Sequence, residues 1–81
     1  PKRQGWLRNV CVALGNAGDP DAVEPLIEVL RSEPEPMIRV HAAWALGRMG
    51  TRTAQAALEQ AANADPDELV REECLLSREQ A

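Results

Sequence analysis

The sequence predicts an all-α fold, an α-α superhelix of about five helices with a period of 32 residues. The first observation is internal repetition, since a shift of 32 positions places Ala13-Leu14-Gly15 on Ala45-Leu46-Gly47 and Gly18 on Gly50. The second is composition: the hydrophobic 44% of the chain consists mainly of Ala, Leu and Val, without Phe or Tyr, which suits close-packed helices better than sheets. Units of such a repeat must stack, because none buries its apolar face alone.

Apolar residues recur at helical spacing early in the chain and predict two helices. The first covers residues 6 to 17 and ends before Gly18, a residue suited to the left-handed turn after a helix. Asp19-Pro20-Asp21 then begins a second helix over about residues 21 to 31, because Asp accepts from free amide groups and Pro is tolerated in the first turn. The expected core stripes are Trp6, Val10, Ala13, Leu14 and Ala17, followed by Ala22, Val23, Leu26, Ile27 and Leu30.

The same plan continues to the end of the chain. A third helix is expected over about residues 37 to 48, a fourth over about 52 to 63, and a fifth over about 67 to 78. Pro34 and Pro36 separate the first two units, because the residue before a proline disfavours helix. We expect one domain at 1–81, with a first unit at 1–36, a second at 37–68 and the start of a third at 69–81. A chain that opens on Pro1 and stops inside a third copy is expected to be a fragment of a longer protein.

Charge alternates along the chain with the repeat. The net charge of -4 counts against nucleic-acid binding when taken alone. However, residues 1–18 carry Lys2, Arg3 and Arg8 without any acid, for a charge of +3, whereas residues 19–36 carry six acids and one arginine, for -5. Residues 37–55 return to +3 and residues 56–81 to -5. If alternate helices form alternate layers, the two faces of the stack differ in sign.

Several function classes are disfavoured by what the sequence lacks. A domain of 81 residues has no room for a deep catalytic cavity, and no P-loop, G-x-G-x-x-G or Ser-His-Asp arrangement is present. Cys11 and Cys74 stand at apolar-pattern positions and are expected to be buried, reduced thiols. With His41 as the only imidazole, neither a zinc site nor an iron-sulfur cluster is expected in this chain. No membrane-spanning run or signal segment is present, so a cytoplasmic location is expected.

The residue pattern of the repeats resembles that of a known family. The pattern Ile38-Arg39-x-x-Ala42-Ala43-x-Ala45-Leu46-Gly47-x-x-Gly50 is similar to the inner helix of a HEAT-like repeat of the PBS-lyase type, and Ala22-Val23-x-Pro25-Leu26-Ile27-x-x-Leu30 is similar to the outer helix. Tetratricopeptide repeats need aromatic Tyr and Phe positions, and ankyrin repeats need a Thr-Pro-Leu-His-like turn. Neither is present here.

A narrower resemblance is to the C-terminal HEAT-like domain of epoxyqueuosine reductases. It is carried by Leu7-Arg8-Asn9, Ala13-Leu14-Gly15-Asn16, Gly18-Asp19-Pro20, His41-Ala42-Ala43-Trp44-Ala45-Leu46-Gly47 and Val70-Arg71-Glu72-Glu73. The resemblance implies a parent oxidoreductase that reduces epoxyqueuosine to queuosine in the anticodon loop of transfer RNA. It also implies that cobalamin and two four-iron clusters are held by domains upstream of this fragment, which itself needs no cofactor.

RNA-binding candidates follow from the acid-free segments. Arginine and lysine neutralise phosphates, and an aromatic face stacks on an unpaired base. We expect Val40, Trp44 and Gly47 to point away from the core, over a low floor left by Gly15 and Gly47. For Trp44, packing between repeats and exposure on a basic surface both stay open. The candidates are Lys2, Arg3, Arg8, Asn9, His41, Trp44, Arg48 and Arg52.

Arg39 and Arg71 occupy equivalent places near Glu35 and Asp67. We expect them to form structural ion pairs that hold one repeat to the next. If partly exposed, each pair contributes about 1 kcal/mol or less.

The sequence therefore predicts a non-catalytic domain that docks transfer RNA and acts as a scaffold in a queuosine-forming reductase. Its expected partners are transfer RNA, through the parent enzyme, and the upstream catalytic domains of the same chain, but no membrane. One alternative is a solenoid for protein-protein interaction or interdomain packing. A free-standing lyase subunit of the phycobilin type is disfavoured, because nothing in the chain is suited to hold a tetrapyrrole.

Overall fold

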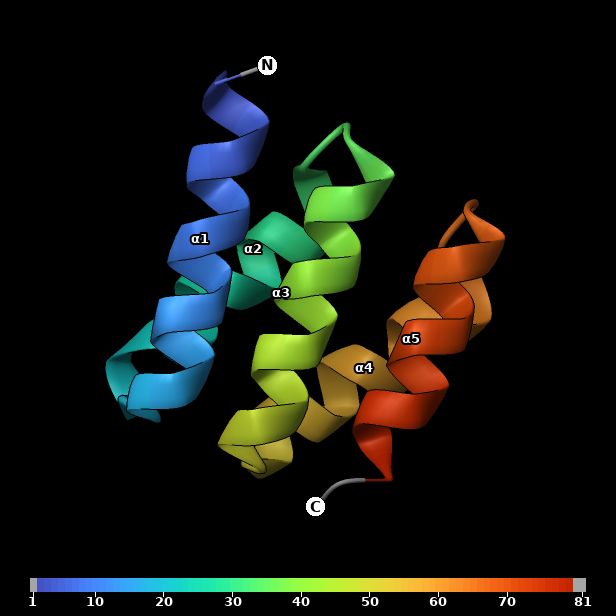
Figure 1. Cartoon of the computed structure of the whole chain (residues 1–81). Helices are drawn as coiled ribbons and strands as arrows, with labels where there is room; N and C mark the ends of the chain where they lie inside the picture. Colours follow the sequence, from blue (N-terminus) through green and yellow to red (C-terminus); the bar gives the residue numbers. More distant parts are fainter. Residues whose placement is uncertain (1, 80–81) are drawn as a thin grey trace.

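The computed structural model describes residues 2–79, which form five α-helices and one short 3-10 helix (Figure 1). This part of the chain contains no strand, so the predicted all-α class is confirmed. The elements are α1 (Lys2–Ala17), η1 (Pro20–Ala22), α2 (Val23–Ser32), α3 (Pro36–Met49), α4 (Arg52–Ala64) and α5 (Glu68–Arg78).

The helices form two layers. Helices α1, α3 and α5 lie side by side and run in the same direction, and α2 and α4 lie behind them (Figure 1). Each helix of the first layer packs on the next, and α3 and α5 also contact the second-layer helix that precedes them. Alternate helices therefore occupy alternate layers, as the period predicts.

Local signals place most of the helix boundaries. Gly18 and Gly50 adopt φ values of 67° and 69°, the left-handed conformation that glycine permits after a helix. Thr51 and Asp67 cap α4 and α5 by accepting hydrogen bonds from backbone amides. Asp19 caps the short helix η1 instead of α2, so α2 begins two residues later than predicted.

The start of α1 was predicted four residues too late. The helix begins at Lys2, because Lys, Arg and Gln at its first three positions are good helix formers and two of these side chains are held by partners in the loop between α2 and α3. Arg3 and Gln4 donate hydrogen bonds to the carboxylates of Glu33 and Glu35.

The core lies between the two layers. Ile38, Ala42 and Leu46 of α3 are buried as predicted. Ala42 and Leu46 belong to one core cluster that includes buried residues of α1, α2, α4 and α5. The predicted stripe of α1 is wrong in part: Trp6 is 64% exposed, and Ala13 and Ala17 are also exposed. Apolar spacing marks a face that suits burial, but in residues 2–79 no helix covers that face of α1. The buried residues of α1 are Cys11 and Gly15, and Leu14 of the predicted stripe packs against the core as a partly buried side chain.

Two glycines set the spacing of the first layer. A Cβ atom on Gly15 would lie 3.0 Å from the Cα of Ala45, and one on Gly47 would lie 2.7 Å from the backbone oxygen of Ser77. Both glycines are buried at helix contacts, so the expectation that they leave a low floor on an open surface is wrong. They let α1, α3 and α5 approach closely.

Candidate nucleic-acid interface

Arg39 joins three segments of the chain at the end where α3 begins. Its guanidinium donates two hydrogen bonds to the carboxylate of Asp65, at 2.9 and 3.0 Å, and another to the backbone oxygen of Glu33 at 2.8 Å. The prediction that Arg39 pairs with Glu35 is wrong, because its partner is Asp65. The prediction of a partly exposed ion pair is also wrong, because the side chains of Arg39 and Asp65 are both buried. The ion pair itself lies within the second unit, 37–68. Arg39 reaches the preceding unit through the backbone oxygen of Glu33, so the expected link between one repeat and the next is made by that hydrogen bond.

Asp65 is the centre of this network. Burial raises the pKa of its carboxyl, but the hydrogen bonds from Arg39 and from the Asp67 amide outweigh burial, so the pKa lies below its ordinary value. Arg71 donates to the backbone oxygen of Asp65 at 2.7 Å, the same contact that Arg39 makes with Glu33, 32 residues earlier. The expected contact between Arg71 and the Asp67 side chain is not seen. These arginines are structural.

Arg3, one of the RNA-binding candidates, is engaged within the domain. It forms a two-pronged ion pair with Glu33, with both nitrogen–oxygen distances below 3 Å. The hydrogen bonds from Arg3 lower the pKa of Glu33. Arg3 is therefore positioned to hold α1 against the α2–α3 loop.

The candidates Arg8 and His41 meet in a groove between α1 and α3 of about 320 Å³. His41 places Nδ1 2.7 Å from the backbone oxygen of Met37. Because a carbonyl oxygen only accepts, Nδ1 carries a proton, and in the neutral ring Nε2 remains an acceptor. The groove is lined by Gln4, Gly5, Arg8, Glu35, Met37, Ile38 and His41.

Trp44 and Arg48 continue the same surface along α3. The indole packs against Gly15 and the core, and the guanidinium of Arg48 lies 5.8 Å from the centroid of the Trp44 ring, within the range of a cation–π contact. Trp44 is half-buried, so it both packs between helices and exposes part of its ring. His41, Trp44 and Arg48 are spaced by three and four residues, which places them on one stripe of the helix.

We call Arg8, His41, Trp44 and Arg48 the α1–α3 face. The other candidates do not join it. Arg52 belongs to α4, in the second layer. Lys2 and Asn9 are exposed, but they share a stripe of α1 that lies about 100° around the helix axis from Arg8.

The first layer is not uniformly basic, which corrects the expected charge separation. Helix α5 belongs to this layer and carries Glu68, Glu72 and Glu73. The expected separation fails because the acidic segment 56–81 includes parts of both layers, α4 in the second and α5 in the first. The basic surface is therefore limited to α1 and α3.

An apolar groove between α3 and α5 was missed by the sequence analysis. Leu69 and Leu76 are 58% and 62% exposed, and Met37 also lines the groove. The two leucines stand seven residues apart, outside the core stripe of α5 that contains Val70 and Cys74. The seven-residue spacing of Leu69 and Leu76, which marks a second apolar stripe on α5, is the sequence feature that predicts this groove. The groove is lined by Met37, Val40, Leu69, Glu72, Glu73 and Leu76.

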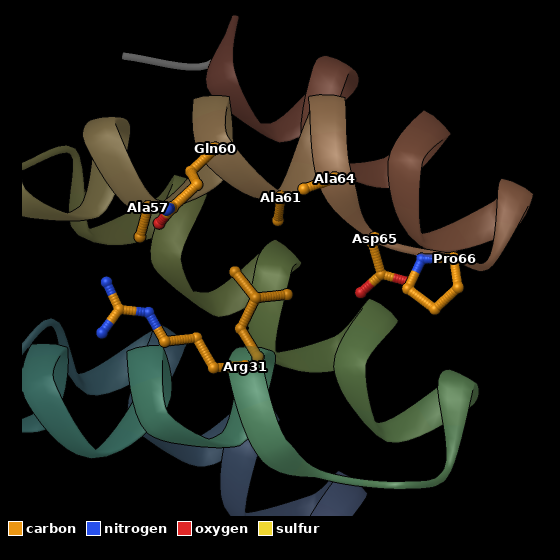
Figure 2. A pocket seen from close by; sticks show the side chains of 8 residues that line it. Arg31, Ala57, Gln60, Ala61, Ala64, Asp65 and Pro66 are labelled. Atoms are coloured by element: carbon orange, nitrogen blue, oxygen red, sulfur yellow. The ribbon is translucent and has the colours of Figure 1, made fainter.

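A further depression of about 270 Å³ lies in the second layer (Figure 2). Figure 2 shows the Arg31 side chain of α2 extending below Ala57 and Gln60 of α4. The depression exists because the α4 residues that line it are mostly alanines with short side chains. It brings together no cluster of reactive groups.

No metal-binding arrangement occurs in the described residues. Within 2–79, no three His, Cys, Asp or Glu side chains are grouped to hold a metal ion. Cys11 and Cys74 are free and buried, as predicted, and burial raises the pKa of Cys74 to about 12. They lie on helices α1 and α5 and do not fit an iron-sulfur cluster, which needs several closely spaced thiolates. Nor is any helix in this range both long and apolar enough to cross a membrane.

Comparisons with known proteins agree with this architecture. Residues 7–77 match the family described as HEAT repeats. The chain is 39% identical to the epoxyqueuosine reductase of Listeria monocytogenes over 82% of its own length, and 38% identical to that of Bacillus subtilis over 75%. It spans only 17% and 16% of those two proteins. No solved structure matches the chain significantly. With most of its length matched, the chain belongs to the HEAT repeat family.

Proposed function

We propose that this chain is a non-catalytic domain that docks transfer RNA and acts as a scaffold in a protein of the epoxyqueuosine reductase type. Its similarity to proteins of that name over most of its length supports this assignment. The reductase chemistry, with the cobalamin and iron-sulfur clusters implied by the resemblance, would belong to parts of such a protein outside this sequence. Such a protein would act in the cytoplasm.

The observation that carries the docking role is the convergence of two arginines, a histidine and a tryptophan on the α1–α3 face. Arg8 and Arg48 offer positive charge to phosphates without reading sequence. The exposed part of the Trp44 ring offers a surface for an unpaired base, as found in the recognition of RNA loops. His41 Nε2 adds a hydrogen-bond acceptor beside Arg8.

The acidic residues of α5 define where the RNA lies. Glu72 and Glu73 border the α3–α5 groove and repel phosphates. The backbone of a bound RNA would therefore follow α1 and α3 and avoid α5. Because only a few phosphates are contacted, affinity of the isolated domain is expected in the non-specific range, roughly 10⁻⁴ to 10⁻⁶ M.

The test is fluorescence anisotropy with a labelled anticodon stem-loop at several salt concentrations. We expect affinity to fall as salt rises, and Arg8→Glu with Arg48→Glu to weaken binding and flatten the salt dependence by about one unit of slope per lost phosphate contact. A matched control is Arg31→Glu with Arg52→Glu, which makes the same total charge change at two exposed arginines of the second layer. Equal binding by the double variant and the original chain would refute docking through this face.

A protein partner is the second candidate function. The exposed leucines of the α3–α5 groove, Leu69 and Leu76, favour it, because adjacent exposed apolar side chains are typical of protein contacts. Binding there would depend little on salt and would be lost in Leu69→Ser with Leu76→Ser, while Arg8→Glu would leave it intact. The two groups of variants thus separate the two functions.

A further inference from the structure

The outer face of α1 differs from its counterparts in the other first-layer helices. We define this α1 outer face as Trp6, Val10, Ala13 and Ala17. Trp6 is 64% exposed, whereas the residues 32 and 64 positions later, Ile38 and Val70, are at most 2% exposed. Ala13 is exposed, but Ala45 and Ser77 at the equivalent positions are fully buried.

In α3 and α5 the equivalent face is covered by a pair of helices. Helices α1 and α2 cover α3, and α3 and α4 cover α5. We call the contact between two successive first-layer helices a joint. At each joint, a glycine of the earlier helix packs against a small residue thirty positions later in the sequence. Gly15 lies against Ala45, and Gly47 lies against Ser77.

From this repeated joint we infer that the α1 outer face seats a further helix pair of the same kind, with a glycine of that pair packed against Ala13. The face has the composition that the joint requires. Trp6 and Val10 stand where apolar core residues stand in α3 and α5, and Ala13 is as small as Ala45. This inference does not depend on RNA binding, because Arg8 and the α1–α3 face lie on another side of α1.

A second copy of this chain does not fit as the occupant. To repeat the joint, the second copy would have to offer α5 as the preceding helix, with a glycine 32 positions after Gly47. That position holds Glu79, whose side chain is too large for a contact in which even a Cβ atom would collide. The occupant is therefore a helix pair of another sequence, with a glycine at the position that Glu79 holds here.

The test extends the chain with a probe pair. Residues 37–68 are copied in front of residue 5, which keeps the 32-residue register and places the copied Gly47 opposite Ala13. Because this replaces Arg3, the partner of Glu33, the extended chain also carries Leu7→Arg, which puts an arginine at the position equivalent to Arg39. The readout is maleimide labelling of Ala13→Cys, a change that the joint tolerates because Ser77 has a similar size.

We expect the introduced thiol to react readily in the 81-residue chain and about tenfold or more slowly in the extended chain, because labelling then requires local opening. Asn16→Cys is the control for a position that stays accessible, since its equivalent Arg48 is exposed. Replacing the copied Gly47 by leucine should restore fast labelling.

Three outcomes would overturn the inference. The first is equally fast reaction of the thiol at position 13 in both chains while circular dichroism shows that the added helices are folded. The second is failure of the added helices to fold. The third is protection in the 81-residue chain that rises with protein concentration, which would assign the face to a second copy.

Discussion

Gly47 and Ser77 pack so closely that a Cβ atom on the glycine would lie 2.7 Å from the serine backbone oxygen. The same joint recurs between Gly15 and Ala45, where such an atom would lie 3.0 Å from the nearest backbone atom. Backbone atoms cannot move aside as a flexible side chain can. The stacking of the first-layer helices therefore depends on two positions that carry no side chain.

Gly47→Ala is expected to destabilise the domain by about 1 to 3 kcal/mol, the usual cost of overpacking a tight interior contact. The matched control is Gly5→Ala, also within a helix, where a Cβ atom meets nothing within 4 Å. That change should stabilise the domain by about 0.5 to 1 kcal/mol through better helix propensity. Urea denaturation followed by circular dichroism measures both. Equal effects of the two substitutions would show that close packing at Gly47 does not matter.

Arg39→Met is expected to lower the free energy of unfolding by about 3 kcal/mol or more, because it leaves the Asp65 carboxylate buried without its partner. Arg78→Met is the comparison, since Arg78 lies 3.7 Å from Glu59 in an exposed pair. Its loss should cost less than about 1 kcal/mol. Thermal and urea unfolding of both variants give the measurement, and a small effect of Arg39→Met would contradict its role as the link between helix pairs.

Stability is expected to fall in acid. The pKa values of Glu33 and Asp65 are lowered in the folded state, so their ionised forms stabilise the fold above their ordinary pKa values. That contribution is lost as pH falls through the lowered values, from about pH 4 downwards. Urea midpoints between neutral pH and about pH 3 should therefore decrease. In Asp65→Asn the decrease should be smaller, and an unchanged slope would contradict this assignment.

Gln55→Val is expected to stabilise the domain. The side-chain nitrogen of Gln55 is buried without a hydrogen-bond partner among the described residues, and the equivalent position in α2 is a buried valine, Val23. Removing an unsatisfied amide should gain about 1 to 2 kcal/mol. Gln60→Val, at an exposed position of the same helix, carries the same propensity cost and should stay within about 0.5 kcal/mol of the original. A loss of stability in Gln55→Val would mean that the amide is satisfied by water.

The all-α fold was predictable from the sequence because the chain repeats. Helical spacing of apolar residues and glycines at helix ends recur at equivalent positions, so each predicted helix is supported by a second, independent copy of the same pattern. The core of α3 followed directly, and so did the buried thiols of Cys11 and Cys74. What periodicity does not reveal is which neighbours are present, and for this reason Trp6 was predicted to be buried.

The site was harder to predict because its residues are brought together by tertiary contacts. Arg39 pairs with Asp65, 26 residues away, although Glu35 is nearer in sequence. Arg3 was grouped with the RNA-binding candidates although Glu33 engages it. The acidic residues of α5 lie in the first layer, although the charge of the whole segment 56–81 predicts them on the opposite side, because that segment includes helices of both layers. Arg8 and His41, by contrast, were correctly expected on the first layer, and the structure places them in one groove.

The most direct test of RNA docking is a chemical-shift titration of the ¹⁵N-labelled chain with an anticodon stem-loop, a method suited to weak binding. The account predicts the largest changes at Arg8, His41, Arg48 and the Trp44 indole, with Arg31 and Arg52 of the second-layer helices unchanged. Changes centred on Leu69 and Leu76, or on α2 and α4, with none at the α1–α3 face, would contradict it.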